Sequence, residues 1–248
     1  MGLWSIGSVT DYKNHRVAVL GGGSFGTAIA NMIASNGYAV TLWLRSEVRA
    51  ASIRDSRENS DYLPGYQLHS AMEVSTDLEQ ALAGAQTVFF AVPSSSFREL
   101  AKRAFPFLNK DCVLVSTAKG IEAHSFMLPS EILEQEIPHC SVGVISGPNL
   151  AREIAQFEIT ATVIASENAE LCERIQTLLG SQYFRVYANH DRYGVELAGA
   201  LKNIYAIVAG IAEAMDVGQN TKAVVLTRSL AEMSRFAVHL GANPLTFL

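Results

Sequence analysis

The sequence has few cysteines and no excess of basic residues. Its three cysteines, Cys112, Cys140 and Cys172, are odd in number and lie 28 and 32 residues apart, so neither a disulfide framework nor a CxxC motif is present. This usage favours a reducing, cytoplasmic setting. Nineteen Lys and Arg against twenty-four Asp and Glu give a net charge of −5, which argues against a broad nucleic-acid surface and leaves local anion sites open. The six histidines lack metal-ligand spacing, so we expect no metal.

The sequence also shows no pattern typical of a secretory signal, a myristoylation signal or a membrane span. Residues 1–15 lack a basic segment followed by an apolar one, and Ile6 stands where a myristoylation signal needs Ser or Thr. We interpret them as an N-terminal extension. The most apolar stretch elsewhere, 197–215, is interrupted by Lys202 and Asn203, which makes it too polar to span a bilayer. We therefore expect no membrane span.

The chain has enough apolar residues to form a folded core, with 49% apolar and 17% charged residues. From Arg16 onward, short β-branched runs alternate with helical patterns, which is typical of a parallel α/β sheet. Strands are expected at 16–20, 39–44, 87–92, 112–116, 142–146, 160–166 and 183–187. The first helix is expected over 25–36, ending at Asn36-Gly37.

The pattern changes near residue 190, where strands stop and two long helical patterns, 192–215 and 221–240, begin. We therefore predict a nucleotide-binding domain at 16–190 and a helical domain at 191–248. Because repeats and Pro/Ser linkers are missing between them, we expect the two parts to pack closely.

A glycine-rich turn directly follows the first strand. Gly21, Gly23 and Gly26 form GxGxxG between a strand and a helix, the context that a dinucleotide site requires. Gly21 permits the tight turn, Gly23 lets a pyrophosphate approach the backbone, and Gly26 lets helix and strand pack closely. Ser24 and Phe25 open the helix and are expected to contact the cofactor. The alternative is a purely structural glycine turn.

The second strand ends in Arg45-Ser46, where a site that prefers NAD usually presents a carboxylate. Arg45 can pair with a 2′-phosphate, which favours NADP, and the nearby Glu47 leaves use of both cofactors open. A solvated Arg at a strand end is the alternative reading.

Lys202 lies on a helical pattern whose neighbouring positions are small and largely uncharged. At helical spacing these neighbours are Ala198, Gly199, Tyr205 and Ala206. We expect partial burial of the amine, which favours its neutral form and suits proton exchange with a substrate oxygen. The alternative is a lysine that extends from a core helix to solvent.

Seven segments, in order, carry a family resemblance. They are VLGGGSFGTAIA (19–30), YLPG (62–65), AVPSSSFR (91–98), STAKGIE (116–122), ISGPNLAREI (145–154), GVELAGALKNIYAIVAGI (194–211) and NTKAVVLTRSLAEMSR (220–235). Together they resemble NAD(P)-dependent glycerol-3-phosphate dehydrogenases of the bacterial type. The resemblance implies a Rossmann-like doubly wound α/β sheet followed by an all-α second domain, with NAD or NADP as cofactor. GALKN and KGIE fit this family better than hydroxyacid or acyl-CoA dehydrogenases.

The resemblance also implies roles for individual residues. Lys202 would be the general acid/base for the C2 oxygen of dihydroxyacetone phosphate, with Asn203 beside the substrate. Lys119 would contact both substrate and cofactor. Further contacts would be Gly147 and Asn149 to the substrate, and Pro93 and Ala151 to the cofactor. The family usually has Ser or Thr at the position of Asn149, and the Pro93 segment can also be read as an ordinary turn. YLPG is interpreted as structural.

By the same resemblance, the reaction is reversible hydride transfer that gives sn-glycerol 3-phosphate for phospholipid synthesis. The partner is a small molecule, and a homodimer is a possible assembly. The family continues beyond GANPLTFL with a segment that supplies an Asp, an Arg and an Asn to the substrate and its phosphate. We therefore expect an apparently truncated chain with an incomplete second domain. The alternative function is a dinucleotide-binding module without turnover.

Overall fold

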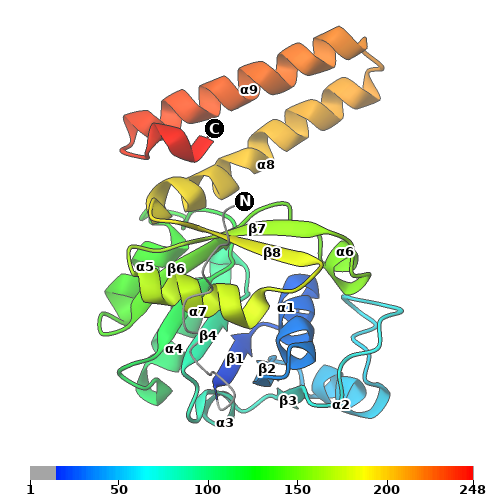
Figure 1. The fold of residues 1–248 in the computed structure, drawn as a ribbon, viewed down its shortest axis with the longest axis vertical. Coiled ribbons are helices and arrows are strands. Elements are labelled where there is room, and N and C mark those ends of the chain that lie inside the picture. The colour runs from blue at the N-terminus through cyan, green and yellow to red at the C-terminus, as the bar shows by residue number, and fades with distance from the viewer. Residues whose placement is uncertain (1–14, 248) are drawn as a thin grey trace, which may run out of the picture.

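The computed structural model describes residues 15–247 and has one eight-stranded sheet at its centre (Figure 1). The strand order is β3-β2-β1-β4-β5-β6-β7-β8. The strands are β1 (Arg16–Leu20), β2 (Ala39–Trp43), β3 (Glu73–Ser75), β4 (Thr87–Phe90), β5 (Val113–Ser116), β6 (Ser141–Ser146), β7 (Thr160–Ala165) and β8 (Phe184–Asn189). Because β1 lies between β2 and β4, the chain order reverses at β1, and ligands of such sheets bind outside the carboxyl ends of the strands there.

Helices cover both faces of the sheet. They are α1 (Ser24–Ser35), α2 (Glu47–Ser56), α3 (Leu78–Leu82), α4 (Phe97–Ala104), α5 (Pro129–Glu136), α6 (Ala151–Ala155) and α7 (Ala169–Leu179). Alternate residues of β1 serve the two faces: Val17 and Val19 belong to the core beneath α1 and α7, and Ala18 and Leu20 to the core beneath α3, α4 and α5. The doubly wound arrangement predicted from the sequence is confirmed.

Two details of the sheet differ from the prediction. β7 pairs antiparallel with β6, whereas the other pairs are parallel. The connection between β6 and β7 contains only α6, whose five residues span roughly 8 Å at 1.5 Å per residue, too short for a crossover that returns to the starting edge. The sequence pattern also missed β3, which has only three residues.

The helical half of the molecule is an antiparallel pair, α8 (Arg192–Ala214) and α9 (Gln219–His239), that extends away from the sheet (Figure 1). The buried side of α8 lies within residues 194–201, which pack on β6 and on a small cluster with Leu128, Ala237 and Phe247. The close packing expected between the two halves is therefore confined to this short part of α8. Many apolar side chains of the pair are exposed, among them Ile204, Ile207, Ile211, Met215, Val224, Leu226, Leu230 and Phe236.

The apolar character of α8 is also greater than expected. Within residues 15–247, α8 is the helix that is long and apolar enough to cross a bilayer by length and composition alone. Lys202 and Asn203 do not take the mean hydropathy of the stretch below this limit. Length and apolar composition are weak evidence for a membrane span by themselves, since apolar helices inside packed domains have both.

Candidate functional site

The glycine turn has the geometry that its spacing predicts. Gly21 has φ of +131°, and a Cβ there would lie 2.2 Å from the carbonyl oxygen of Ala91. A Cβ on Gly26 would lie 2.0 Å from the carbonyl oxygen of Gly21, whereas one on Gly23 would meet nothing within 4 Å. Two glycines are thus required by packing, and the third faces open space. Because Gly23 caps α1 without a side-chain hydrogen bond, the first N–H groups of α1 are free to bind an anion.

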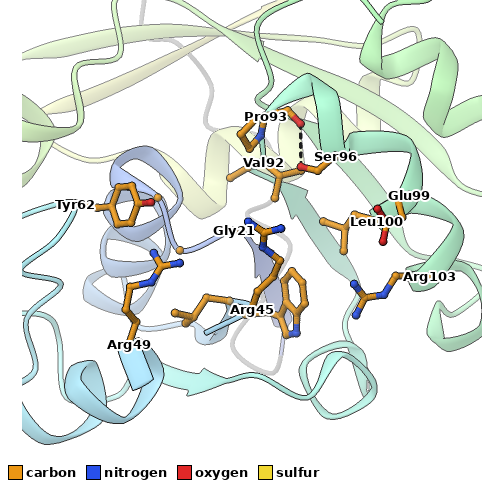
Figure 2. Close-up of a pocket in the computed structure, with 15 residues that line it drawn as sticks. Gly21, Arg45, Arg49, Tyr62, Val92, Pro93, Ser96, Glu99, Leu100 and Arg103 are labelled. Atoms are coloured by element: carbon orange, nitrogen blue, oxygen red, sulfur yellow. Dashed lines mark hydrogen bonds between the residues drawn. The ribbon is translucent and has the colours of Figure 1, made fainter. Parts of the chain in front are cut away.

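A cavity of about 210 Å³ begins at this turn (Figure 2). It lies at the carboxyl ends of β1, β2 and β4, where the order of the sheet reverses. Its lining comes from the glycine turn, the end of β2, α2, the YLPG segment, the segment after β4, and α4, and includes Gly21, Gly23, Trp43, Arg45, Arg49, Tyr62, Val92, Pro93, Glu99, Leu100 and Arg103.

Three guanidinium groups, Arg45, Arg49 and Arg103, line the cavity with the single carboxylate Glu99. The Arg49 guanidinium lies 5.0 Å from the centre of the Tyr62 ring, and that of Arg103 lies 5.8 Å from the centre of the Trp43 ring. The cavity therefore combines flat aromatic surfaces with positive charge, a combination that suits a phosphorylated nucleoside.

Glu47, the acid nearest to Arg45 along the chain, is engaged elsewhere. Its carboxylate accepts a hydrogen bond of 2.6 Å from Thr76 Oγ1 and pairs with Arg54. These partners hold the pKa of Glu47 below its usual value. No carboxylate from the end of β2 is among the residues that line the cavity, so no acid from that strand end accompanies Arg45 in the lining.

The segment after β5 carries Lys119 and lies against the Pro93 segment. Gly120 has φ of +146°, and a Cβ there would lie 3.1 Å from Ser94 Oγ. Arg98 donates to both oxygens of Glu122, from Nε at 2.8 Å and from Nη2 at 2.7 Å. This bidentate pair lowers the pKa of Glu122 to about 2 and fixes the Lys119 segment to α4.

Lys119 and Lys202 come together from opposite halves of the molecule. The side chain of Lys119 is exposed at the surface, but the protein around its amine partly desolvates it and lowers its pKa, and the positive charge of Lys202 lowers that pKa further. Lys202 itself is exposed, so its expected partial burial is wrong. The physical reason is that α8 leaves the sheet after Leu201, and nothing in the described part of the chain covers that face. Asn203 is exposed in the same way.

The turn after β6 holds Asn149 in a fixed orientation. Asn149 Nδ2 donates to Thr162 Oγ1 at 2.9 Å, and Thr162 Oγ1 donates to the carbonyl oxygen of Ser146 at 3.1 Å. The amide oxygen of Asn149 is buried and has no hydrogen-bond partner. Leaving a buried acceptor unpaired is costly. A Cβ on Gly147 would lie 3.1 Å from the carbonyl oxygen of Ala161.

A second cavity, of about 610 Å³, lies between the start of α1 and the start of α6. Ser24, Tyr62 and Ala151 contribute to its lining, and Ser24 Oγ donates to the carbonyl oxygen of Tyr62 at 2.6 Å. Phe25 instead packs against the core, so it lines neither this cavity nor the one at the glycine turn.

Sequence reasoning missed several residues of the first cavity, among them the aromatic and basic side chains Trp43, Arg49, Tyr62 and Arg103. Tyr62 belongs to the YLPG segment that was interpreted as structural, and it lines both cavities. Its place among the seven matching segments was a usable signal. The sequence carries no signal that would place Arg49 and Arg103 in the cavity, because each lies on a helix whose position relative to the glycine turn depends on the fold.

Comparison with known proteins identifies the family. The description "NAD-dependent glycerol-3-phosphate dehydrogenase N-terminus" matches residues 16–172, and the corresponding C-terminus matches residues 191–248. The chain is 59% identical over 232 residues to a glycerol-3-phosphate dehydrogenase [NAD(P)+] of Pseudomonas aeruginosa, covering 94% of this chain and 68% of the relative. It is 56% identical over 233 residues to the same enzyme of Teredinibacter turnerae, with the same coverage.

Solved structures agree. The glycerol-3-phosphate dehydrogenase of Coxiella burnetii superposes with a TM-score of 0.89 at 35% identity, covering 94% of this chain and 72% of that one. The protein named DsGPDH of Dunaliella salina gives a TM-score of 0.83 at 29% identity, covering 90% of this chain and 42% of that one. The predicted Rossmann-like fold with a helical second part is thereby confirmed. The chain belongs to the NAD-dependent glycerol-3-phosphate dehydrogenase family.

Proposed function

We propose that this chain catalyses hydride transfer between NAD(P)H and dihydroxyacetone phosphate, giving sn-glycerol 3-phosphate. The observation that carries the proposal is geometric: Gly120, next to Lys119, packs against Ser94 in the segment that borders the glycine-turn cavity, and Lys202 is near enough for its charge to act on the Lys119 amine. Two positive charges there suit a phosphorylated substrate with a reactive oxygen.

The residues present fit a dinucleotide. Close packing occupies the space at Gly21 and Gly26, the space at Gly23 is open, and the cavity offers arginines and aromatic rings. Gly21, Gly23, Ser24 and Gly26 would hold the pyrophosphate end, and Arg45 would hold a 2′-phosphate. When bound, NAD(P)H supplies the hydride. We propose further cofactor contacts from Phe25, Pro93, Lys119 and Ala151.

In this proposal Lys202 donates a proton to the C2 oxygen as negative charge develops on it. Lys119 adds positive charge at the same place. Asn203 and Asn149 would orient the substrate hydroxyl groups, with Gly147 beside them. The division into a nucleotide domain at 16–190 and a helical domain at 191–248 is part of the same proposal.

We also propose a biological setting. The product is a building block of glycerophospholipids, so the reaction would serve their synthesis in the cytoplasm. The exposed apolar side chains of α8 and α9 support self-association as a homodimer.

Cofactor binding and turnover are tested separately. Calorimetry with NADH and NADPH measures binding, and cofactor oxidation with dihydroxyacetone phosphate measures turnover. The Lys202→Ala variant should lose turnover by at least about a hundredfold and keep its cofactor affinity nearly unchanged. Lys110→Ala removes another exposed lysine, distant from Lys202 in the sequence, and is the control that should keep turnover. Cofactor binding without any turnover in the unsubstituted chain would reject the enzyme and leave a dinucleotide-binding module.

A further inference from the structure

Two cysteines that lie 28 residues apart in the sequence meet at the amino ends of β5 and β6. The register pairs Val113 with Ser141, which places the preceding residues, Cys112 and Cys140, directly opposite each other. Their Sγ atoms are 3.0 Å apart, and both side chains are buried, with 2% and 9% exposure. The sequence spacing gives no sign of this pairing.

The backbone already has the separation that a disulfide needs. Neighbouring strands lie about 4.8 Å apart. Disulfides join Cα atoms roughly 4.4–6.8 Å apart. Both cysteines are free thiols here. Forming the bond would therefore require rotation of the two side chains and no movement of either strand.

The two thiols are chemically unequal. The hydrogen bond between them lowers the pKa of Cys140 and raises that of Cys112, so Cys140 is the better thiolate. Cys140 is also the less buried of the two and follows the turn that leads into β6. The geometry thus offers an attacking sulfur, that of Cys140, slightly nearer the surface than the resolving sulfur of Cys112.

We propose that Cys112 and Cys140 form an oxidisable dithiol that a hydroperoxide converts into a disulfide. The Cys140 thiolate attacks one peroxide oxygen, an S–O bond forms as the O–O bond breaks, and Cys140 becomes a sulfenic acid while the other oxygen takes up a proton and leaves as water or an alcohol. Cys112 then attacks the Cys140 sulfur and displaces its oxygen as water. The two thiols lose two electrons and two protons, and the peroxide is reduced.

The resulting bond would close the chain segment from Cys112 to Cys140, which carries Lys119 and α5. It would lie at the opposite ends of the strands from the glycine turn, because Cys112 precedes β5 and Lys119 follows it. Oxidation should therefore leave NADH affinity unchanged. The dithiol does not depend on the proposed catalytic function, and a chain that fails to turn over substrate would still show it.

The test treats the full native chain with hydrogen peroxide and measures its intact mass and its unreduced peptide map. We expect loss of two hydrogen masses, a cross-linked peptide pair containing Cys112 and Cys140, and full reversal by dithiothreitol. The map of the unsubstituted chain assigns the site without relying on the folding of any variant.

Cys172 supplies a matched control, because it is equally buried and has no thiol neighbour. Cys172→Ser should keep the mass loss, and Cys112→Ser and Cys140→Ser should each abolish it. The proposal is overturned if the native chain loses no hydrogens, if Cys172 is oxidised first, or if the cross-link forms only after denaturation.

Discussion

The sheet half and the helical half of this chain differ in how completely they bury their own apolar residues. Every residue of β1 from Val17 onward is buried, and its side chains alternate between two cores. In α9, by contrast, Ala237 is the one buried residue of twenty-one. The sheet half therefore holds its share of the candidate site by its own packing, whereas the helical half depends on a short contact.

That contact lies within residues 194–201 of α8. Gly199 packs so closely on β6 that a Cβ would lie 2.7 Å from Ser146 Oγ. Glu196 accepts hydrogen bonds from Ser130 N at 3.1 Å and from Ser130 Oγ at 2.5 Å, at the start of α5. Lys202 follows directly, so its distance from Lys119 is set by these few residues.

The largest expected effect is the loss of stability when one buried side chain in each half is truncated to alanine. Phe89 and Leu197 are both nearly fully buried, one in β4 and the other in α8. Phe89→Ala should lower the free energy of unfolding of the sheet half by about 3–5 kcal/mol, and Leu197→Ala should weaken the packing of α8 by about 2–5 kcal/mol. Hydrogen exchange after Leu197→Ala should show lost protection in α8 and α9 with β1 and β4 unchanged. Equal loss in β1 would mean that the chain unfolds as one cooperative unit.

A second comparison tests the polar part of the contact through pH. Burial raises the pKa of Glu196 to about 7 from an ordinary 4.5. Between these values the folded chain holds a proton that the unfolded chain has lost. The stabilisation is therefore complete below pH 4.5 and is lost as the pH rises through about 7.

The Glu196→Gln variant has no proton to lose at this position. The free energy of unfolding of the unsubstituted chain should fall by up to about 3 kcal/mol between roughly pH 5 and pH 8. The free energy of unfolding of Glu196→Gln should not show this fall. Urea unfolding at both pH values measures the difference, and Glu79→Gln, an exposed acid on α3 away from this contact, is the control. The same decline in Glu196→Gln would show that other groups cause it.

The third prediction concerns the glycine turn within the sheet half. Gly26→Ala should cost about 1–3 kcal/mol of stability, because its Cβ would lie 2.0 Å from the carbonyl oxygen of Gly21. Gly23→Ala should leave the urea midpoint nearly unchanged, because its Cβ would face open space, yet it should weaken NADH binding measured by calorimetry. If Gly23→Ala bound NADH as well as the unsubstituted chain, the pyrophosphate would not lie over Gly23.

The two halves also differ in how well sequence reasoning predicted them. β1, β2 and the five strands from β4 to β8 follow apolar, β-branched runs that report local burial, so they were found within a few residues. β3 is too short to form a pattern, and the reversed direction of β7 follows from the length of α6. The exposure of Lys202 was missed because helical periodicity shows which residues share a face and leaves open what covers that face.

Residues of the site that come from separate segments were hardest to predict. Arg49, Tyr62 and Arg103 meet the glycine turn only through the packing of α2, α4 and the YLPG segment around it. Cys112 and Cys140 meet only through strand register. Gly21 and Gly26 were predictable because their reasons are local: a turn with positive φ and a close approach of helix to strand.

The smallest expected effect leaves stability untouched and concerns the cofactor. Arg45 is exposed at the end of β2, and Glu47 is engaged with Thr76 and Arg54, so a 2′-phosphate would meet positive charge there. A charge-assisted hydrogen bond is worth about 1.5–3 kcal/mol, so Arg45→Asp should raise the Kd of NADPH roughly ten- to hundredfold and change that of NADH much less. Arg185→Asp makes the same charge change on exposed β8 and should alter neither Kd. Equal loss for both cofactors would mean that Arg45 shapes the cavity and does not read the 2′-phosphate.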